Sequence, residues 1–106
     1  MTLRQEKVNN LMKKLVAEFF RNNAGKKSLI TVTDFRISSD LKRGTIFITV
    51  LPETLEDEAL EFGKRKRSDI REYIKSKTNM KSLPYIDVKI DQGERRRQKL
   101  DSLLRE

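Results

Sequence analysis

Residues 29–51 read LITVTDFRISSDLKRGTIFITVL and decide the fold, because they contain two β-rich runs joined by a polar turn. From residue 45 to residue 50, isoleucine and valine alternate with threonine and phenylalanine, which is the period-2 pattern of a strand. In the first run, Ile30 and Val32 share one face, whereas Phe35 and Ile37 fall on the other. This change of register predicts a β-bulge near Thr33–Asp34.

The residues between the two runs have the composition of a turn. Turn chemistry is supplied by Ser38-Ser39-Asp40 and Gly44, and Asp40 is suited to capping the turn. The two runs are therefore expected to form a β-hairpin. A hairpin alone is unstable in water, so helices or further strands must cover its apolar face.

The composition of the chain limits the classes of protein to which it can belong. With 106 residues it is expected to form one domain with a modest core, since 36% of residues are hydrophobic and 38% are charged. It has no cysteine, which excludes disulfides and thiolate chemistry, and no apolar run of signal or membrane-spanning length. We expect a soluble cytoplasmic monomer with no membrane partner. The net charge of +8 favours a polyanionic partner.

An amphipathic helix is predicted before the hairpin, over residues 2–21. Thr2 is a suitable N-cap, and Gly25 is expected to end the helix with a positive φ. The apolar stripe that should face the core consists of Val8, Leu11, Met12, Leu15, Val16, Phe19 and Phe20.

A second helical region follows Pro52, which ends the second strand. Thr54 is expected to cap it, with acidic residues in its first turn. Its apolar stripe is interrupted at Lys66, and one continuous helix would bury that lysine. Two helices that meet near residues 66–69 would expose it, with Ser68 or Asp69 capping the second, and we favour this arrangement.

The last part of the chain predicts a strand and a terminal segment. Residues 85–91 alternate strictly, with Ile86, Val88 and Ile90 facing inward. The terminal segment is either a short helix that docks through Leu100, Leu103 and Leu104 or a frayed tail.

The resulting element order is α-β-β-α-α-β, an α+β fold. We expect a mixed three-stranded sheet ordered 1-2-3 with a parallel, right-handed crossover and helices on one face. The expected domains are residues 1–92 and a basic C-terminal segment, residues 93–106.

Charge is distributed unevenly along the helical region. Residues 52–62 carry a net charge of −5, and residues 63–82 carry +6. The basic run Lys64–Arg67 coincides with the expected start of a helix, whose free N–H groups also attract phosphate. This coincidence indicates a site for an RNA backbone.

Catalytic signatures are missing from the sequence. There is neither histidine nor cysteine, and the four glycines form no phosphate-binding motif. The acidic residues of 53–61 are better explained as a helix start and a solvated face than as a metal site. We therefore expect no enzyme, no cofactor, no metal and no small-molecule substrate. That acidic face could instead dock a basic protein partner.

The chain resembles the type II KH fold and, more narrowly, the ribosome-binding factor A family of bacteria. The resemblance covers nearly the full length of the chain. The matching segments are the first-helix pattern after Arg4, Ile30-Thr31-Val32-Thr33, Ser39-Asp40-Leu41, Ile46 to Leu51, Ile70-Arg71, Leu83-Pro84-Tyr85-Ile86 leading to Asp91, and a leucine-containing terminal segment. The Gly-x-x-Gly loop of ordinary KH domains is missing. The family has Ala-x-Gly at the kink between its paired helices, and the spacing puts Lys66-Arg67-Ser68 there.

The resemblance implies a non-catalytic ribosome-binding factor that acts in maturation of the small (30S) ribosomal subunit. It would bind 16S rRNA or its precursor through a basic surface. The alternative is a protein-interaction adaptor that docks a basic partner on the acidic Glu53–Glu61 face. The RNA-binding candidates are Lys64, Arg65, Lys66, Arg67, Arg71 and Lys75, then Arg36, Lys42 and Arg43, then Arg95, Arg96 and Arg97.

Overall fold

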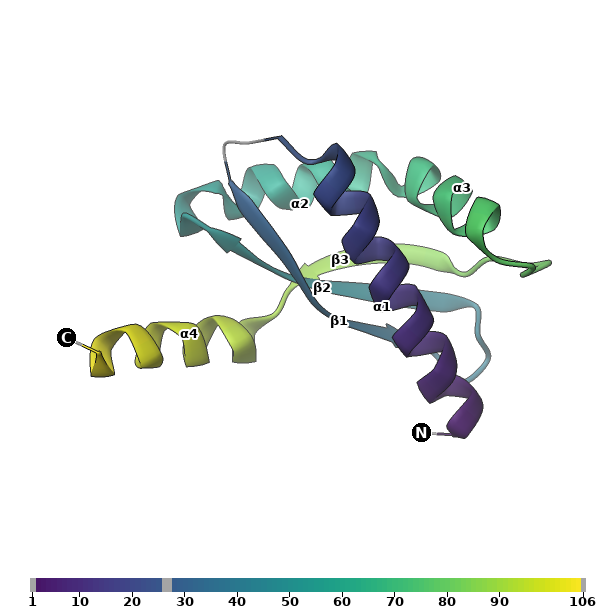
Figure 1. Ribbon diagram of the computed structural model, residues 1–106, viewed down its shortest axis with the longest axis horizontal. Helices are drawn as coiled ribbons and strands as arrows, with labels where there is room; N and C mark the ends of the chain where they lie inside the picture. The colour runs from purple at the N-terminus through teal and green to yellow at the C-terminus, as the bar shows by residue number, and fades with distance from the viewer. Residues whose placement is uncertain (1, 26–27, 106) are drawn as a thin grey trace.

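The sheet is the centre of the molecule, and three helices cover one of its faces (Figure 1). The structure is a computed structural model that describes residues 2–25 and 28–105. The strands β1 (Leu29–Ile37), β2 (Arg43–Leu51) and β3 (Tyr85–Ile90) lie in the order β1-β2-β3. β1 pairs antiparallel with β2, and β2 pairs parallel with β3, as the sequence predicts.

The hairpin β1–β2 contains the predicted bulge. Its register shifts between Val32 and Asp34. The β1 residues that face the helices are therefore even-numbered before the bulge and odd-numbered after it. Asp40 caps the turn by accepting hydrogen bonds from the Ser38 hydroxyl and from the Lys42 N–H at 3.0 Å. The positive φ of this turn belongs to Leu41, at 62°. Gly44 lies inside β2 instead, so its expected role in the turn is wrong.

The helix α1 (Leu3–Asn23) packs along β1 and begins as predicted. Thr2 Oγ1 accepts from the Gln5 N–H at 3.2 Å, and Gln5 Oε1 accepts from the Thr2 N–H at 3.0 Å, which is a capping box. The helix ends at Asn23, and its C-cap residue Ala24 has an extended conformation. No described glycine has a positive φ, so the expected role of Gly25 is wrong.

The apolar stripe of α1 is shorter than its sequence suggests. Leu11 is 43% exposed, so its predicted core position is wrong. Asn9 is buried nearby instead, and its Oδ1 accepts from the Ile37 N–H at 2.8 Å. A polar side chain thus satisfies a backbone group at the edge of the sheet.

The region after Pro52 is divided into three pieces, namely the 3-10 helix η1 (Glu53–Leu55), α2 (Glu56–Arg65) and α3 (Arg67–Lys77). The break at Lys66 confirms the two-helix prediction. Both predicted caps are wrong. The 3-10 turn precedes α2, so Thr54 is not its N-cap, and α3 begins after Lys66 without a side-chain cap from Ser68 or Asp69.

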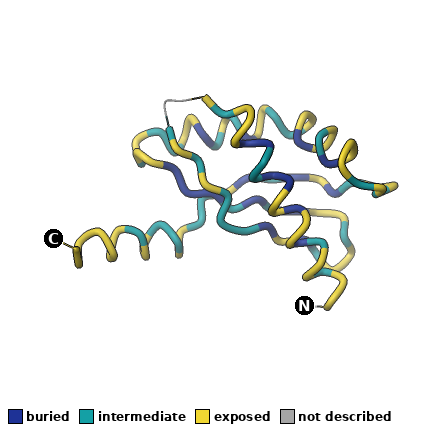
Figure 2. The backbone as a smooth tube through the Cα atoms, in the orientation of Figure 1, coloured by how far each residue is buried: buried dark blue, intermediate teal, exposed yellow. Residues whose placement is uncertain are grey.

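The core lies between the sheet and the three helices, where Figure 2 shows the buried backbone. Gly63 lets α2 approach β3 closely, since a Cβ at this position would lie 3.0 Å from Val88 Cγ2 and 3.3 Å from Val88 Cγ1. The fully enclosed hydrophobic side chains of the core include Met12, Phe35, Ile46, Ile48, Ile70, Ile74 and Ile86.

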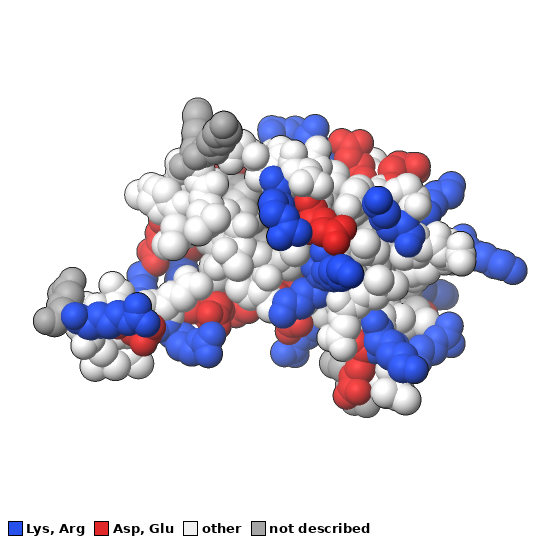
Figure 3. Space-filling view, in the orientation of Figure 1, with Lys and Arg blue, Asp and Glu red and all other residues white. Residues whose placement is uncertain are grey.

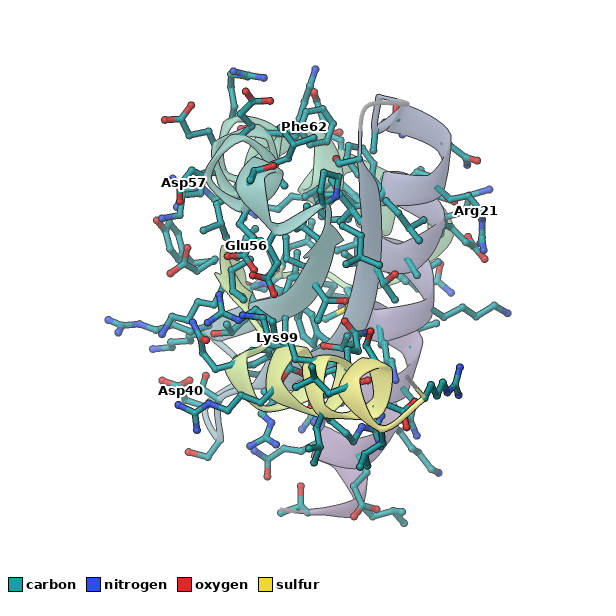
Figure 4. All side chains as sticks on the ribbon, turned by 90° about the vertical axis from the view of Figure 1, so that its left-hand side faces the viewer. Arg21, Asp40, Glu56, Asp57, Phe62 and Lys99 are labelled. Atoms are coloured by element: carbon teal, nitrogen blue, oxygen red, sulfur yellow. The ribbon has the colours of Figure 1, made fainter. Side chains whose placement is uncertain are left out.

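The terminal helix α4 (Gln92–Leu104) projects away from the body of the molecule (Figure 1). Leu100, Leu103 and Leu104 are 58%, 68% and 76% exposed, so the prediction that they dock the helix is wrong. Polar contacts tie α4 to the body through Arg95 and Lys99, which pair with Glu56 at 3.0 Å and Glu53 at 3.2 Å. Figure 4 shows Lys99 and Glu56 on neighbouring elements. None of the described helices is both long and apolar enough to cross a membrane.

Candidate nucleic-acid interface

The junction between α2 and α3 is formed by one residue, Lys66. Lys66 has φ −94° and ψ 10°, its N–H donates to Phe62 O at 3.0 Å, and its carbonyl accepts from the Ile70 N–H at 2.9 Å. The buried faces of the two helices continue on either side, through Gly63 in α2 and Ile70 in α3. The break therefore leaves Lys64 and Arg65 exposed to solvent without removing either helix from the core.

Four of the predicted RNA-binding side chains near this junction are exposed: Lys64, Arg65, Arg71 and Lys75. Within the part of the chain that the structure describes, none of the four forms an ion pair. Lys66 is partly buried, with a side chain 40% exposed, and its Nζ lies 3.6 Å from Asp69 Oδ2. Because cations without partners keep their charge available, these four residues can contact an external anion.

Arg67 joins the junction to the sheet. Its Nε donates to Lys64 O at 3.0 Å, and its Nη1 donates to the hydroxyl of Tyr85. The guanidinium carbon also lies 5.4 Å from the centre of the Tyr85 ring, within cation–π range. Tyr85 is the first residue of β3, and its N–H donates to Lys42 O at 2.8 Å. Arg67 and the hairpin residue Lys42 thus meet at one tyrosine.

A surface hollow of about 610 Å³ lies beside this tyrosine. It is lined by Lys42, Arg43, Gly44, Thr45, Tyr85, Asp87 and Lys89. Lys42 and Arg43 are exposed, and Asp40 holds the turn that carries them. The Ser38 hydroxyl and the Lys42 N–H, which both donate to Asp40, keep the pKa of that carboxyl below its usual value. Two hydrogen bonds to one carboxylate therefore hold the turn.

The structure does not bring the remaining predicted cations to this surface. Arg36 lies on β1, at the other edge of the sheet, where it pairs with Asp34 at 3.2 Å. On α4, Arg95 is tied to Glu56, Arg97 pairs with Glu94 at 2.7 Å, and Arg96 is exposed. Tyr85 begins β3, whereas α4 follows the carboxyl end of that strand. The six residues of β3, a length of about 20 Å, therefore separate the α4 cations from the tyrosine.

Sequence reasoning missed three residues of this surface: Tyr85, Lys89 and Lys81. Lys81 lines a smaller hollow of about 260 Å³ with Arg71 and Lys75. Tyr85 carried a usable signal, because it is an aromatic residue at an outward position of an otherwise alternating strand. Its neighbours could not be inferred, since Arg67 and Tyr85 are 18 residues apart.

The arrangement can bind a polyanion. Its cations surround a partly exposed aromatic ring, and α3 begins at the same place with N–H groups that its own helix does not use. Figure 3 shows that Lys and Arg side chains also lie over α1, with acidic groups between them.

Within residues 2–25 and 28–105, no three acidic, histidine or cysteine side chains are grouped to hold a metal ion.

Comparison with known proteins agrees with this architecture. A family model described as Ribosome-binding factor A matches residues 4–104. The chain is 28% identical over 109 residues to ribosome-binding factor A of Methylobacterium nodulans, with 98% of this chain and 81% of the relative covered. It is 26% identical over 96 residues to that of Macrococcus caseolyticus, with 88% and 84% covered.

Solved structures share the fold. The crystal structure of ribosome-binding factor A from Thermus thermophilus superposes with a TM-score of 0.73 at 20% identity, covering 81% of this chain and 94% of that chain. The NMR structure of a putative ribosome-binding factor A from Thermotoga maritima gives 0.72 at 21% identity, with 86% and 90% covered. A Thermus thermophilus homology model that was fitted into a cryo-EM map of a 30S complex gives 0.68 at 21% identity, with 76% and 88% covered.

Proposed function

The chain belongs to the ribosome-binding factor A family, and on this premise we propose that it binds the small ribosomal subunit during its maturation. A homology model of ribosome-binding factor A from Thermus thermophilus was fitted into a cryo-EM map of its complex with the 30S subunit. Small-subunit rRNA is the polyanion that such a partner supplies. The role is non-catalytic and belongs to the cytoplasm, where ribosomes are assembled.

The observation that carries this proposal is the convergence of exposed cations on the α2–α3 junction and the end of the hairpin. Lys64, Arg65 and Arg71 surround the junction, and Arg67 connects it through Tyr85 to Lys42. Phosphate contacts of this kind position a protein on RNA without reading its bases. We therefore expect binding that depends on RNA shape and falls steeply with salt.

The cations on α4 are assigned a smaller part in this function. Arg95 and Arg97 already neutralise carboxylates of the chain, and releasing them to bind phosphate would cost those ion pairs. Arg36 is committed to Asp34 in the same way. Arg96 is the α4 cation best placed to add a phosphate contact, because it is exposed and forms no ion pair with the described residues.

The adaptor alternative finds less support, because the acidic face is partly used by the chain itself. Glu53 and Glu56 pair with Lys99 and Arg95, which leaves Asp57, Glu58 and Glu61 exposed. A basic partner would therefore meet three free carboxylates of the five in the sequence.

Co-sedimentation tests the proposed function directly. The protein is mixed with purified small or large subunits at several salt concentrations and centrifuged through sucrose. We expect it to pellet with small subunits and to be released as salt rises. Equal pelleting with both subunits would show diffuse attraction to rRNA, and absence from the small-subunit pellet at low salt would reject the proposal.

A further inference from the structure

Tyr85 has an unusual environment for an exposed aromatic residue. Its side chain lies at the start of the edge strand β3, and the residue is 58% exposed. In the sheet it is paired with Arg43, while Lys89 lies four residues along the same strand and on the same side. Arg67 from the helix layer contacts both its ring and its hydroxyl. One cation, Arg67, therefore contacts the ring, and three more, Lys42, Arg43 and Lys89, line the hollow beside it.

These contacts restrain Tyr85 and leave more than half of its surface exposed. The hydrogen bond from Arg67 restrains the hydroxyl, and the bond from the Tyr85 N–H to Lys42 O restrains the backbone. The hollow of about 610 Å³ beside the ring leaves room for a planar group. Proteins bind unpaired nucleotides by stacking bases on aromatic rings and guanidinium planes while basic groups hold the phosphates.

A second aromatic–arginine pair on the open face makes an instructive comparison. Arg36 lies 6.0 Å from the centre of the Phe47 ring, but the hollow beside that ring is lined by Asp34 and Asp91. Arg36 is also neutralised by Asp34. The hollow at Tyr85 has only Asp87 against its three lysine and arginine side chains. Charge therefore favours Tyr85 as the place for an anionic ligand.

We propose that Tyr85 is a stacking platform for one unpaired RNA base, whose phosphates contact Lys42, Arg43, Arg67 and Lys89. This inference rests on the proposed function and adds to it the kind of RNA that the surface takes. In an RNA duplex the bases are stacked on each other and cannot reach the ring, so the site selects a single-stranded segment or a bulge.

Tyrosine fluorescence provides the test, because the chain has two tyrosines and no tryptophan. In a Tyr73→Phe background, Tyr85 is the remaining emitter. The phenylalanine keeps the ring that packs on Phe19 and removes a hydroxyl that donates to Glu18. The probes are a 10-nucleotide single-stranded RNA and a blunt duplex of the same length, at one salt concentration. We expect the single strand to quench the emission, because a stacked base quenches tyrosine, and the duplex to leave it nearly unchanged.

Affinity measurements with labelled RNA separate stacking from structure. Tyr85→Ala should weaken single-strand binding by roughly 5- to 100-fold and duplex binding hardly at all. Tyr85→Phe should retain single-strand binding, because the ring remains. Phe47→Leu is the matched control on the same face of the sheet and should change neither.

Three results would overturn the inference: no quenching by the single strand, no binding of the single strand, or equal losses for both RNAs in Tyr85→Ala. Each is distinguishable from failure of the proposed function, which is scored by co-sedimentation with small subunits. Suppose that the Tyr85→Ala protein pellets with small subunits as well as the unchanged protein and in the same salt-sensitive way, and that the two proteins bind single-stranded RNA with equal affinity. The proposed function would then be retained, and the stacking site would be excluded.

Discussion

At the scale of single residues, Gly44 shows how a tertiary contact can decide a position. It follows a turn in the sequence, yet it lies in β2 opposite Ile37 with no positive φ. What requires glycine is the Phe35 ring, because a Cβ at position 44 would lie 2.4 Å from Phe35 Cζ. Phe35 is fully buried and has little freedom to move aside.

Gly44→Ala should therefore destabilise the fold. We expect the free energy of unfolding to fall by about 1–3 kcal/mol, the usual cost of overpacking a core. Chemical denaturation monitored by circular dichroism measures the difference. Gly25→Ala is the control, because nothing lies within 4 Å of a Cβ there. A Gly44→Ala protein as stable as its control would show that the Phe35 ring does not need this space.

Asp91 couples stability to pH. Its Oδ2 accepts from the Thr33 hydroxyl at 2.6 Å and its Oδ1 accepts from the Glu94 N–H at 3.0 Å, so it caps α4. These two bonds hold the pKa of Asp91 below its ordinary value, the Thr33 bond having the larger effect. A lowered folded-state pKa stabilises the protein above the unfolded-state pKa, and the contribution is lost as pH falls through the folded-state value.

Asp91→Ala should accordingly cost about 1 kcal/mol at pH 7, the typical contribution of a helix N-cap. The difference between the two proteins should shrink as pH is lowered from about 4, where free aspartate begins to protonate. Thermal melts of both proteins across this pH range provide the measurement. A difference that grows on acidification would contradict the assigned sign.

The site was predictable in part at this scale. The exposure of Lys64 and Arg65 follows from a charge run that falls outside the apolar stripe. The pairing of Arg95 with Glu56, away from the junction, does not follow from any local pattern, because the two residues are 39 positions apart in the sequence. Pairings across such separations depend on the packed fold, which no local pattern contains.

At the scale of elements, the break between α2 and α3 was predictable because Lys66 would otherwise continue the buried stripe. The hairpin, its bulge and β3 follow from alternation in the same way. The docking of α4 was not predictable, since its leucines have helical spacing but no partner surface. Periodicity identifies an apolar side of a helix and says nothing about what covers it.

Truncation distinguishes the two halves of α4. Removal of residues 100–106 should change the free energy of unfolding by no more than about 0.5 kcal/mol, because the leucines that it removes are exposed. Arg95→Ala should cost about 1–3 kcal/mol, the range for a charged hydrogen bond. That substitution leaves Glu56, whose side chain is only 15% exposed, without its partner. Denaturant titrations test both, and a truncation that costs more than Arg95→Ala would show that the leucines pack.

At the scale of the whole molecule, the charge is spread more widely than the proposed site. Lys13, Lys14 and Arg21 on α1 are as exposed to solvent as the cations of the junction. The net charge of +8 alone would attract rRNA at long range. The central claim is that the α2–α3 junction makes specific phosphate contacts beyond this general attraction.

The most direct test compares two triple variants in binding to purified small subunits over a range of salt concentrations. Lys64, Arg65 and Arg71 are each changed to Gln in one protein, and Lys13, Lys14 and Arg21 in the other, so both lose three positive charges. Glutamine is chosen because it removes charge without opposing the dipole at the end of α2. Circular dichroism confirms that both remain folded.

We expect the junction triple to bind more weakly than the unchanged protein. The slope of log affinity against log salt should also become shallower, by somewhat less than about one unit for each phosphate that the protein no longer neutralises. The α1 triple should keep nearly the slope of the unchanged protein. Equal losses in the two triples, or unchanged binding by a folded junction triple, would contradict the claim that this surface holds the RNA.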